Sequence, residues 1–196
     1  MIIVADKNQF AGSHGKSNYK KHRAMAEAGI SVLSVPLPFG DYCRLNAGMK
    51  ETIIRRHDKL KKADLMGDIK LAIDSKKDLV EVAQNVCSKS HSRFRDECIL
   101  SQKVGARLIV LVEEPNIHSV RDVFTWHNPR MNRYNKIKRM HEQGKWQQVP
   151  LPSRPPVSGQ TLAKAMITME KKYGVEWQFC SREDAGKRII EILSEG

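Results

Sequence analysis

The sequence predicts a single α/β domain over residues 1–196, with a mixed central β-sheet and helices on both faces. Two observations support this prediction. Short apolar runs of strand length alternate with longer segments in which apolar residues recur at helical spacing. A chain of 196 residues with 40% hydrophobic and 29% charged residues is also long enough to bury one proper core.

The N-terminal part of the chain begins with a predicted strand, a loop and a helix. Residues 1–5 are a short apolar run typical of a buried strand, and a helical pattern covers residues 16–28 before a glycine ends it. Residues 30–35 predict a second strand, and residues 41–45 a third. Residues 47–62 fit a strand pair or a short amphipathic helix, and both alternatives stay open.

The loop between the first strand and the first helix ends in Gly15-Lys16-Ser17, as a phosphate-binding loop does. Phe10 stands where that motif requires its first glycine, so the tight turn that cradles phosphates is compromised. The alternative is a plain connector with Ser17 near the helix cap. A nucleotide-binding enzyme that uses Gly15-Lys16-Ser17 is therefore only the third functional hypothesis.

The central predicted strand, which begins near residue 69, places an acid and a lysine at its far end. Asp74 and Lys76 are two residues apart, so their side chains point to the same side of an extended chain. A carboxylate can hold a divalent metal ion, and a lysine beside it can orient or deprotonate a water molecule. Lys77 would lie on the opposite face, so Lys76 is the predicted catalytic lysine. For this tripeptide alone, a solvated strand end is the simpler alternative.

A second carboxylate is expected beside this strand. Gly40 permits a tight backbone bend and exposes Asp41 at the start of another strand. Magnesium typically takes one or two protein carboxylates and keeps several waters for a phosphate substrate. Asp41 and Asp74, with Lys76 beside them, would therefore form a small Mg²⁺ site.

The remaining elements complete the α/β pattern. After Lys76 the apolar spacing becomes helical, with Asp78 as a natural N-cap. A second helix begins at residue 92 and ends near residue 105, and a buried strand follows. A further helix, strand and helix are expected over residues 160–173, 175–180 and 182–193.

The net charge of +12 and the isoelectric point near 9.7 fit a polyanionic partner such as DNA or RNA. An anionic membrane would attract the same charge, but we find no apolar span, signal peptide or lipidation motif and expect no membrane association. The cysteines have no paired spacing, which argues against a zinc ribbon or a disulfide framework and favours a reducing cytoplasm. They are Cys43, Cys87, Cys98 and Cys180.

Residues 118–159 differ in composition from the rest of the chain. Trp126, Tyr134 and Trp146 are interleaved with lysine and arginine, and four prolines follow. Basic and aromatic side chains in such a pattern can bind a single strand by stacking and charge. The alternative is an insertion with one short helix over residues 132–142 and a proline-rich linker. Contact with nucleic acid is the favoured interpretation.

Gly40-Asp41, followed at a long interval by Asp74-Ser75-Lys76, resembles the Gly-Asp … Glu-Arg-Lys signature of XPF-type structure-specific DNA endonucleases, which belong to the PD-(D/E)XK superfamily. An Arg-Phe segment before the second helix, a buried strand ending at Glu113, and the last strand and helix are also similar to this family. The resemblance covers most of the chain and is interrupted by residues 118–159. The small form is similar to nucleases carried by phages and prophages.

The resemblance implies a restriction-endonuclease-like fold and a Mg²⁺- or Mn²⁺-dependent endonuclease acting on flap, fork or otherwise branched DNA with single-stranded parts. Asp41, Asp74 and the backbone carbonyl of Ser75 would bind the metal, and Lys76 would position the attacking water. A homodimer is compatible with this interpretation, although the sequence leaves the oligomeric state open. Candidates for nucleic-acid binding are Lys77, Arg93 and Arg95.

The chain departs from the family pattern at two places. The family's Asp-x-Arg-Glu-Gln stretch corresponds to residues 5–9, Ala-Asp-Lys-Asn-Gln, in which Asp6 is displaced by one position. Val80 stands where the family has an acid after the lysine, bracketed by Asp78 and Glu81. Asp6, Asp78 and Glu81 are therefore accessory candidates, and a catalytically degenerate protein that binds branched DNA without cutting it is the main alternative.

Overall fold

A six-stranded mixed β-sheet forms the centre of the protein in the computed structural model, which describes residues 1–88 and 91–195, without the side chains of residues 12–17. The strand order is β2-β1-β3-β4-β5-β6. Strand β3 runs antiparallel to both of its neighbours, and the other pairs are parallel. The strands are β1 (Ile2–Asp6), β2 (Ser31–Val35), β3 (Tyr42–Arg44), β4 (Leu71–Lys76), β5 (Arg107–Glu113) and β6 (Glu176–Cys180).

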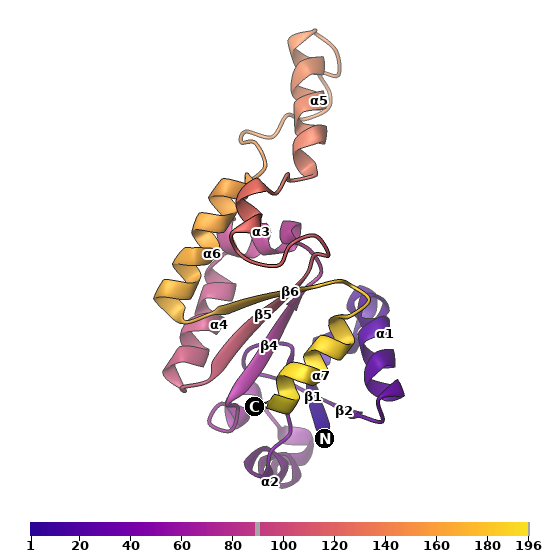
Figure 1. The fold of residues 1–196 in the computed structure, drawn as a ribbon, viewed down its shortest axis with the longest axis vertical. Helices are drawn as coiled ribbons and strands as arrows, with labels where there is room; N and C mark the ends of the chain where they lie inside the picture. The colour runs from indigo at the N-terminus through magenta and orange to yellow at the C-terminus, as the bar shows by residue number, and fades with distance from the viewer. Residues whose placement is uncertain (89–90, 196) are drawn as a thin grey trace.

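Helices cover both faces of this sheet (Figure 1), which confirms the predicted fold class. Helices α1 (Gly12–Glu27) and α7 (Ala185–Glu195) pack on one face. The opposite face is covered by α3 (Leu79–Cys87), α4 (His91–Lys103) and α6 (Gly159–Tyr173).

Helix α2 (Ala47–Arg56) resolves the segment for which two alternatives were open. The side chain of Asn46 accepts a hydrogen bond from the backbone N–H of Met49 at 2.9 Å and so caps the helix. Met49 is buried in the core. A good N-cap and a buried apolar side chain thus favour the helix over the strand pair.

Helix α1 begins earlier than predicted, at Gly12 rather than residue 16. Gly15-Lys16-Ser17 therefore lies within the first turns of a helix rather than in a loop. The side chains of these three residues lie outside the described part of the structure, so the nucleotide-binding hypothesis stays a prediction.

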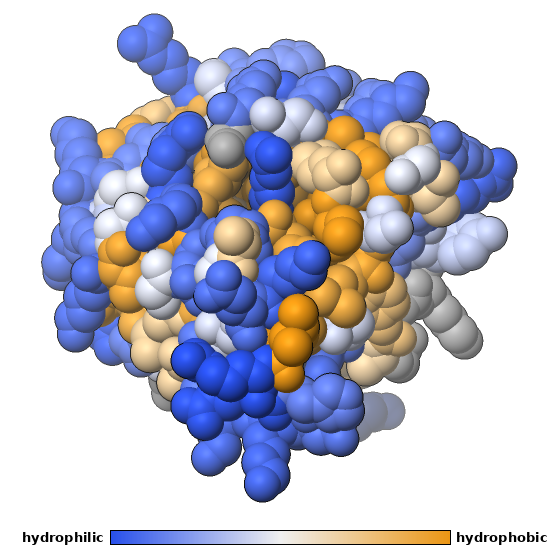
Figure 2. All heavy atoms as spheres, turned by 90° about the horizontal axis from the view of Figure 1, so that it is seen from below, coloured by the Kyte–Doolittle hydropathy of each residue, from blue (hydrophilic) through white to orange (hydrophobic). Residues whose placement is uncertain are grey.

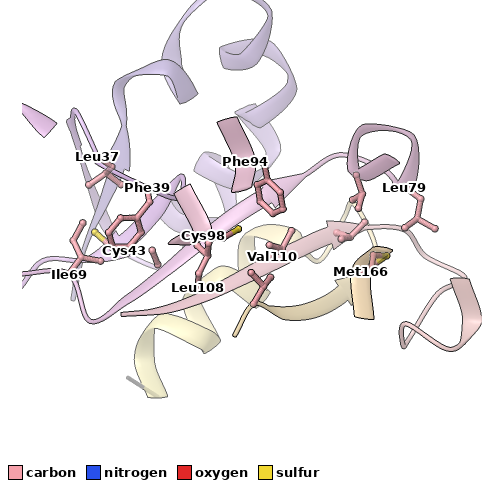
Figure 3. Close-up of a cluster of buried hydrophobic side chains, with 14 of the residues drawn as sticks. Leu37, Phe39, Cys43, Ile69, Leu79, Phe94, Cys98, Leu108, Val110 and Met166 are labelled. Carbon is pink, nitrogen blue, oxygen red and sulfur yellow. The ribbon is translucent and has the colours of Figure 1, made fainter. Parts of the chain in front are cut away.

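Alternate residues of strand β4 enter two separate hydrophobic clusters. Ala72 belongs to the cluster under α3, α4 and α6, whereas Ile73 belongs to the cluster under α1 and α7. Figure 3 shows part of the first cluster, in which Phe94 of α4 lies near Val110 of β5. Because side chains alternate along a strand, Asp74 and Lys76 continue on the first face and Ser75 on the second.

Gly40 brings the start of β3 close to β4. It has φ of +67°, and a Cβ atom there would lie 2.9 Å from the Cβ of Ala72. The next residue, Asp41, donates its backbone N–H to the carbonyl of Ile73 at 2.7 Å. Only glycine accommodates this conformation and this approach together, so Gly40 sets the position of Asp41 beside β4.

The insertion over residues 118–159 carries helix α5 (Arg130–Glu142), which projects from the body of the molecule (Figure 1). Asn128 fastens its base, because its amide donates to the carbonyl of Val157 at 2.9 Å and its side-chain oxygen accepts from the N–H of Arg130 at 3.0 Å. Gly159 packs against the chain beneath it, where a Cβ atom would clash with the carbonyl of Trp126. The insertion is thus anchored at its base while α5 extends outward.

Apolar side chains are exposed on the face that carries the N-terminus and α2, seen as orange surface in Figure 2. Ile2 and Leu33 are exposed on the first two strands, and Ile54 is exposed on α2. None of the described helices has the length and apolar character needed to cross a membrane.

Candidate active site

A cavity of about 820 Å³ opens where the carboxyl ends of β1, β4 and β5 meet the beginning of β3. This edge is the place at which the sequence predicts the site. Asp78 and Arg95 lie outside the lining of the cavity. The predicted site residues that do line it are Asp6, Asp41, Asp74, Ser75, Lys76, Lys77, Glu81 and Arg93.

Asp74 and Lys76 form a buried ion pair at the end of β4. The Nζ of Lys76 donates to Oδ1 of Asp74 at 2.8 Å and lies 5.4 Å from the centre of the Phe94 ring. The other carboxylate oxygen of Asp74, Oδ2, is buried without a hydrogen-bond partner among the described residues. A buried carboxylate oxygen without a partner is costly, so this oxygen is available to a ligand that brings positive charge or a proton.

Asp41 faces this pair from the neighbouring strand. Its Oδ2 accepts the backbone N–H of Ser75 at 2.8 Å, and its Oδ1 accepts the amide of Gln9 at 2.6 Å. Burial, followed by the charge of Asp74, raises the pKa of Asp41 to about 8, although Lys76, the Ser75 N–H and Lys21 act in the opposite direction. A cation bound between the two carboxylates would offset the charge of Asp74, which is the second cause of the raised pKa of Asp41.

Lys76 stays protonated at neutral pH. Burial disfavours its charge, but the carboxylates of Asp74 and Asp41 outweigh this effect and raise its pKa above the ordinary value. The ammonium group can therefore donate a hydrogen bond and stabilise negative charge, whereas it is a poor acceptor for a proton.

A chain of buried amides connects Asp41 to Lys21 of helix α1. The Nζ of Lys21 donates to Oδ1 of Asn18 at 2.9 Å, and the amide of Asn18 donates to Oε1 of Gln9 at 2.6 Å. Gln9 in turn donates to Asp41. All three hydrogen bonds in this series are donated in the direction of Asp41. The series therefore fixes the orientation of the Asp41 carboxylate.

The opposite face of β4 carries a second polar cluster. Lys21 forms a buried ion pair with Glu113 and donates to the hydroxyl of Ser75 at 2.7 Å. The same Ser75 hydroxyl donates to Oε1 of Glu113 at 3.3 Å, and Arg182 lies 3.6 Å from the other Glu113 oxygen. Each carboxylate oxygen of Glu113 therefore faces a cationic partner.

Glu97 of helix α4 is a further acidic side chain in the lining of the cavity. Burial and the charge of Asp74 raise the pKa of Glu97, while Lys76 and Arg93 act against this rise. Arg93 lies one helical turn earlier and pairs with Glu97 at 3.4 Å. Arg95, in contrast, pairs with its neighbour Asp96 at 3.0 Å, away from the cavity.

Two of the accessory candidates are occupied by structural contacts, although they are close to the site. Asp6 accepts the backbone N–H groups of Asn8 at 3.0 Å and Leu37 at 2.9 Å, and Lys62 lies 3.7 Å away. Asp78 caps α3 by accepting the N–H of Glu81 at 2.7 Å. These contacts order the loops around the cavity.

The third accessory candidate and the adjacent lysine lie at the mouth of the cavity. The Glu81 carboxylate accepts the backbone N–H of Lys77 at 3.0 Å, and the Lys77 side chain is exposed. Both residues can meet a ligand that enters from solvent.

The chemistry of the donors at Asp41 and Asp74 fits a magnesium-type ion. Such an ion needs oxygen ligands and often takes only one or two protein carboxylates, and the unpartnered Oδ2 of Asp74 supplies one oxygen. In the described part of the chain, no cluster of three or more His, Cys, Asp or Glu side chains is arranged to bind a metal ion. A metal held here would therefore depend on two carboxylates, a backbone carbonyl and water.

Sequence reasoning did not single out several residues of the site, among them Gln9, Asn18, Lys21, Glu97 and Arg182. Asn18 and Lys21 belong to a helix whose polar face looks like any solvated helix surface, and their burial arises only when α1 packs on the sheet. Glu97 had one usable signal, since it is one helical turn after Arg93, a predicted nucleic-acid contact. Arg182 follows the last strand, and no pattern in the sequence indicates that it reaches Glu113.

The fold is similar to that of XPF from Aeropyrum pernix. The structure of that protein in complex with DNA has a TM-score of 0.52 and 13% sequence identity, and the match covers 99% of this chain and 64% of that chain. A structure of XPF from Aeropyrum pernix gives a TM-score of 0.52 and 12% identity, and the match covers all of this chain and 61% of that chain. The chain thus spans less than two thirds of the XPF chains. No protein-family model and no curated protein sequence matches it.

Proposed function

We propose that the protein is a metal-dependent endonuclease that hydrolyses phosphodiester bonds in DNA. The observation that carries this proposal is the arrangement of Asp41, Asp74 and Lys76 at one end of the cavity, with a buried oxygen of Asp74 left without a partner. The similarity of the fold to XPF supports it.

Asp41, Asp74 and the backbone carbonyl of Ser75 would hold Mg²⁺ or Mn²⁺. The Ser75 N–H already points at Asp41, and in a strand the carbonyl of the same residue points to the same side. When bound, the ion would polarise the phosphoryl oxygen and lower the pKa of a water molecule.

The charged Lys76 has the second role in this proposal. Its ammonium group would donate a hydrogen bond to the attacking water or to a phosphoryl oxygen and offset the negative charge that develops there. Its position is fixed by Asp74 on one side and by Phe94 on the other. The Gln9 amide would keep the Asp41 carboxylate oriented during the same step.

DNA with branched or single-stranded parts is the substrate we propose. The net charge of +12 supports a polyanionic substrate, and Lys77 and Arg93, which line the cavity, would contact its phosphates. Binding by such contacts should weaken steeply with added salt.

The setting we propose is the cytoplasm, supported by the free state of all four cysteines. A homodimer is a further proposal, supported by the exposed apolar residues near the N-terminus, such as Ile2 and Leu33. Light scattering coupled to size-exclusion chromatography would give the mass in solution.

A catalytically degenerate DNA-binding protein is the second candidate. Two observations favour it: the described residues offer no set of three metal-binding side chains, and Asp6 is engaged by backbone N–H groups. In this case the cavity would bind DNA without cutting it.

Cleavage of labelled flap, fork and duplex DNA separates these candidates. Wild type, Asp74→Ala and Lys76→Ala would each be assayed with Mg²⁺, Mn²⁺ or EDTA. We expect cutting by wild type only with metal, and a loss of more than about 100-fold in both variants, since even residues that merely orient metal ligands contribute 10- to 100-fold. Tight binding without cutting would instead support the degenerate protein, and cutting that survives both substitutions would place the site elsewhere.

A further inference from the structure

A groove of about 630 Å³ lies between helix α3 and the insertion. Val80 and Gln84 of α3 form one wall, and Arg133 and Tyr134 of α5 form the other. The proline-rich segment that returns from α5 closes the groove and contributes Arg154. The groove is outside the candidate active site, and the catalytic proposal above does not use it.

The lining of this groove combines apolar surface with unpaired positive charge. The Tyr134 ring is half-buried, with Val80 and the prolines also in the lining. Arg133 and Arg154 are exposed, and neither has a carboxylate partner among the described residues. An aromatic ring beside free guanidinium groups suits a nucleotide, whose base stacks on the ring while its phosphate pairs with arginine.

The groove borders the catalytic cavity. Gln84 lines both of them. The guanidinium of Arg130 lies 2.8 and 3.1 Å from the Gln84 side-chain oxygen when the amide is turned to face it. Helix α3 begins beside Lys76 and is about 13 Å long, so a strand that leaves the cavity along α3 would reach the groove within a few nucleotides.

The charge of the insertion also favours a nucleic-acid strand as the ligand of the groove. Residues 118–159 contain eight lysines and arginines against two acidic residues, and thus carry half of the net charge of +12. Helix α5, which projects from the body of the molecule (Figure 1), contains five of these eight basic residues. A polyanionic strand is therefore favoured over an acidic or neutral peptide that would use only the apolar part.

We propose that this groove binds a single-stranded segment of the nucleic-acid substrate, with a base against Tyr134 and phosphates at Arg133 and Arg154. The proposal rests on the proposed function, because it assigns to the substrate's single-stranded part a binding place next to the site of cleavage. A strand held there would be led past Gln84 toward Asp74 and Lys76, which would favour cleavage near a junction between duplex and single strand.

Fluorescence anisotropy with a labelled oligothymidylate of about 16 nucleotides tests this proposal in EDTA, where no cleavage is needed. Tyr134→Ala should weaken binding by about 5-fold or more, as expected for the loss of one base-stacking contact. Tyr134→Phe keeps the ring and should retain the affinity of wild type. Thermal unfolding of each variant would show that the fold is intact.

Arg133→Ala and Arg139→Ala form a matched pair for the charge. Both residues are exposed on α5, but only Arg133 lines the groove, and Arg139 lies about 120° away around the helix. Arg133→Ala should weaken binding of the oligothymidylate clearly more than Arg139→Ala does. It should also lower the slope of log affinity against log salt by about 0.7, as the loss of one phosphate contact on a single strand predicts.

Three results would overturn the proposal. Equal losses for Arg133→Ala and Arg139→Ala would show a diffuse basic surface, and unchanged binding by Tyr134→Ala would show that the groove takes no base. A loss that is as large for blunt duplex as for the single strand would assign the groove to duplex. Binding to the groove is measured in EDTA, whereas the proposed nuclease activity is measured by cleavage with metal. A protein that does not cleave can therefore still confirm or contradict the groove proposal.

Discussion

Two buried polar clusters lie on opposite faces of the same short strand, and they differ in whether their hydrogen bonds are complete. On one face, Lys21 and Ser75 contact Glu113, whose two oxygens both face cations. On the other face, Lys76 satisfies only one oxygen of Asp74. Complete pairing is what a structural cluster needs, whereas an unpartnered oxygen beside a second carboxylate is typical of a ligand site.

The largest effect on stability is expected from the complete cluster. Lys21→Met leaves the buried Glu113 without its main partner and should lower the free energy of unfolding by about 3 kcal/mol or more. Lys20→Met is the matched control, because Lys20 is exposed and its ion pair with Glu183 has exposed partners. Its effect should stay within about 0.5 kcal/mol. Urea unfolding of both variants measures the difference, and similar losses would contradict a structural role for the Lys21 cluster.

Removing the incomplete cluster, Asp74 and Lys76, should change stability less and in the opposite direction. The double variant Asp74→Leu/Lys76→Met replaces the buried ion pair by apolar side chains of similar volume, and it should be as stable as wild type or gain about 1 kcal/mol or more in metal-free buffer. The same urea experiment in EDTA checks this. A loss comparable to that of Lys21→Met would mean that the Asp74–Lys76 pair contributes to stability in the same way as the Lys21 cluster.

The raised pKa of Asp41 predicts that the stability of the metal-free protein depends on pH. Its pKa is about 8 in the folded chain and near 3.8 ordinarily, so between these values the unfolded chain binds fewer protons than the folded one. Stability should therefore fall as pH rises from about 4 to about 8. Asp41→Asn lacks this titration, so its unfolding midpoint should fall less over the same range. Parallel curves for the two proteins would contradict the raised pKa.

The smallest effect distinguishes two arginines of the same helix. Arg93 lines the cavity and Arg95 does not. In duplex DNA binding, Arg93→Ala should reduce the slope of log affinity against log salt by about 1, and Arg95→Ala should leave it unchanged. Equal slopes for both variants would remove Arg93 from the DNA-contacting surface.

The sequence predicted the fold because most of its elements follow local rules. The apolar runs of β1, β4 and β5 and the N-cap of α3 at Asp78 can be read without knowledge of tertiary contacts. The turn at Gly40 could also be predicted, since its glycine and acid precede a strand. The beginning of α1 could not, because the stretch from Gly12 contains glycines and polar residues that resemble a loop.

Site residues could be predicted where the alternation of side chains along one strand determines their position. They could not be predicted where tertiary packing brings them to the site. Asp74 and Lys76 share a face by the period of the strand alone. Gln9 and Lys21 join the site only because α1 packs over the end of the sheet and buries them. The engagement of Asp6 by the N–H of Leu37, distant in sequence, likewise has no local signal.

Binding of Mn²⁺, measured by titration calorimetry at pH 6 and pH 8, would test most directly whether the free oxygen of Asp74 is a metal ligand. Wild type should bind the ion, more tightly at pH 8, because a pKa of about 8 leaves Asp41 almost fully protonated at pH 6 and about half ionised at pH 8. Asp74→Asn should weaken binding by more than about 100-fold. Asp78→Asn, the same change at a helix cap outside the cavity, should leave it intact. Equal binding by wild type and Asp74→Asn would contradict the proposed centre.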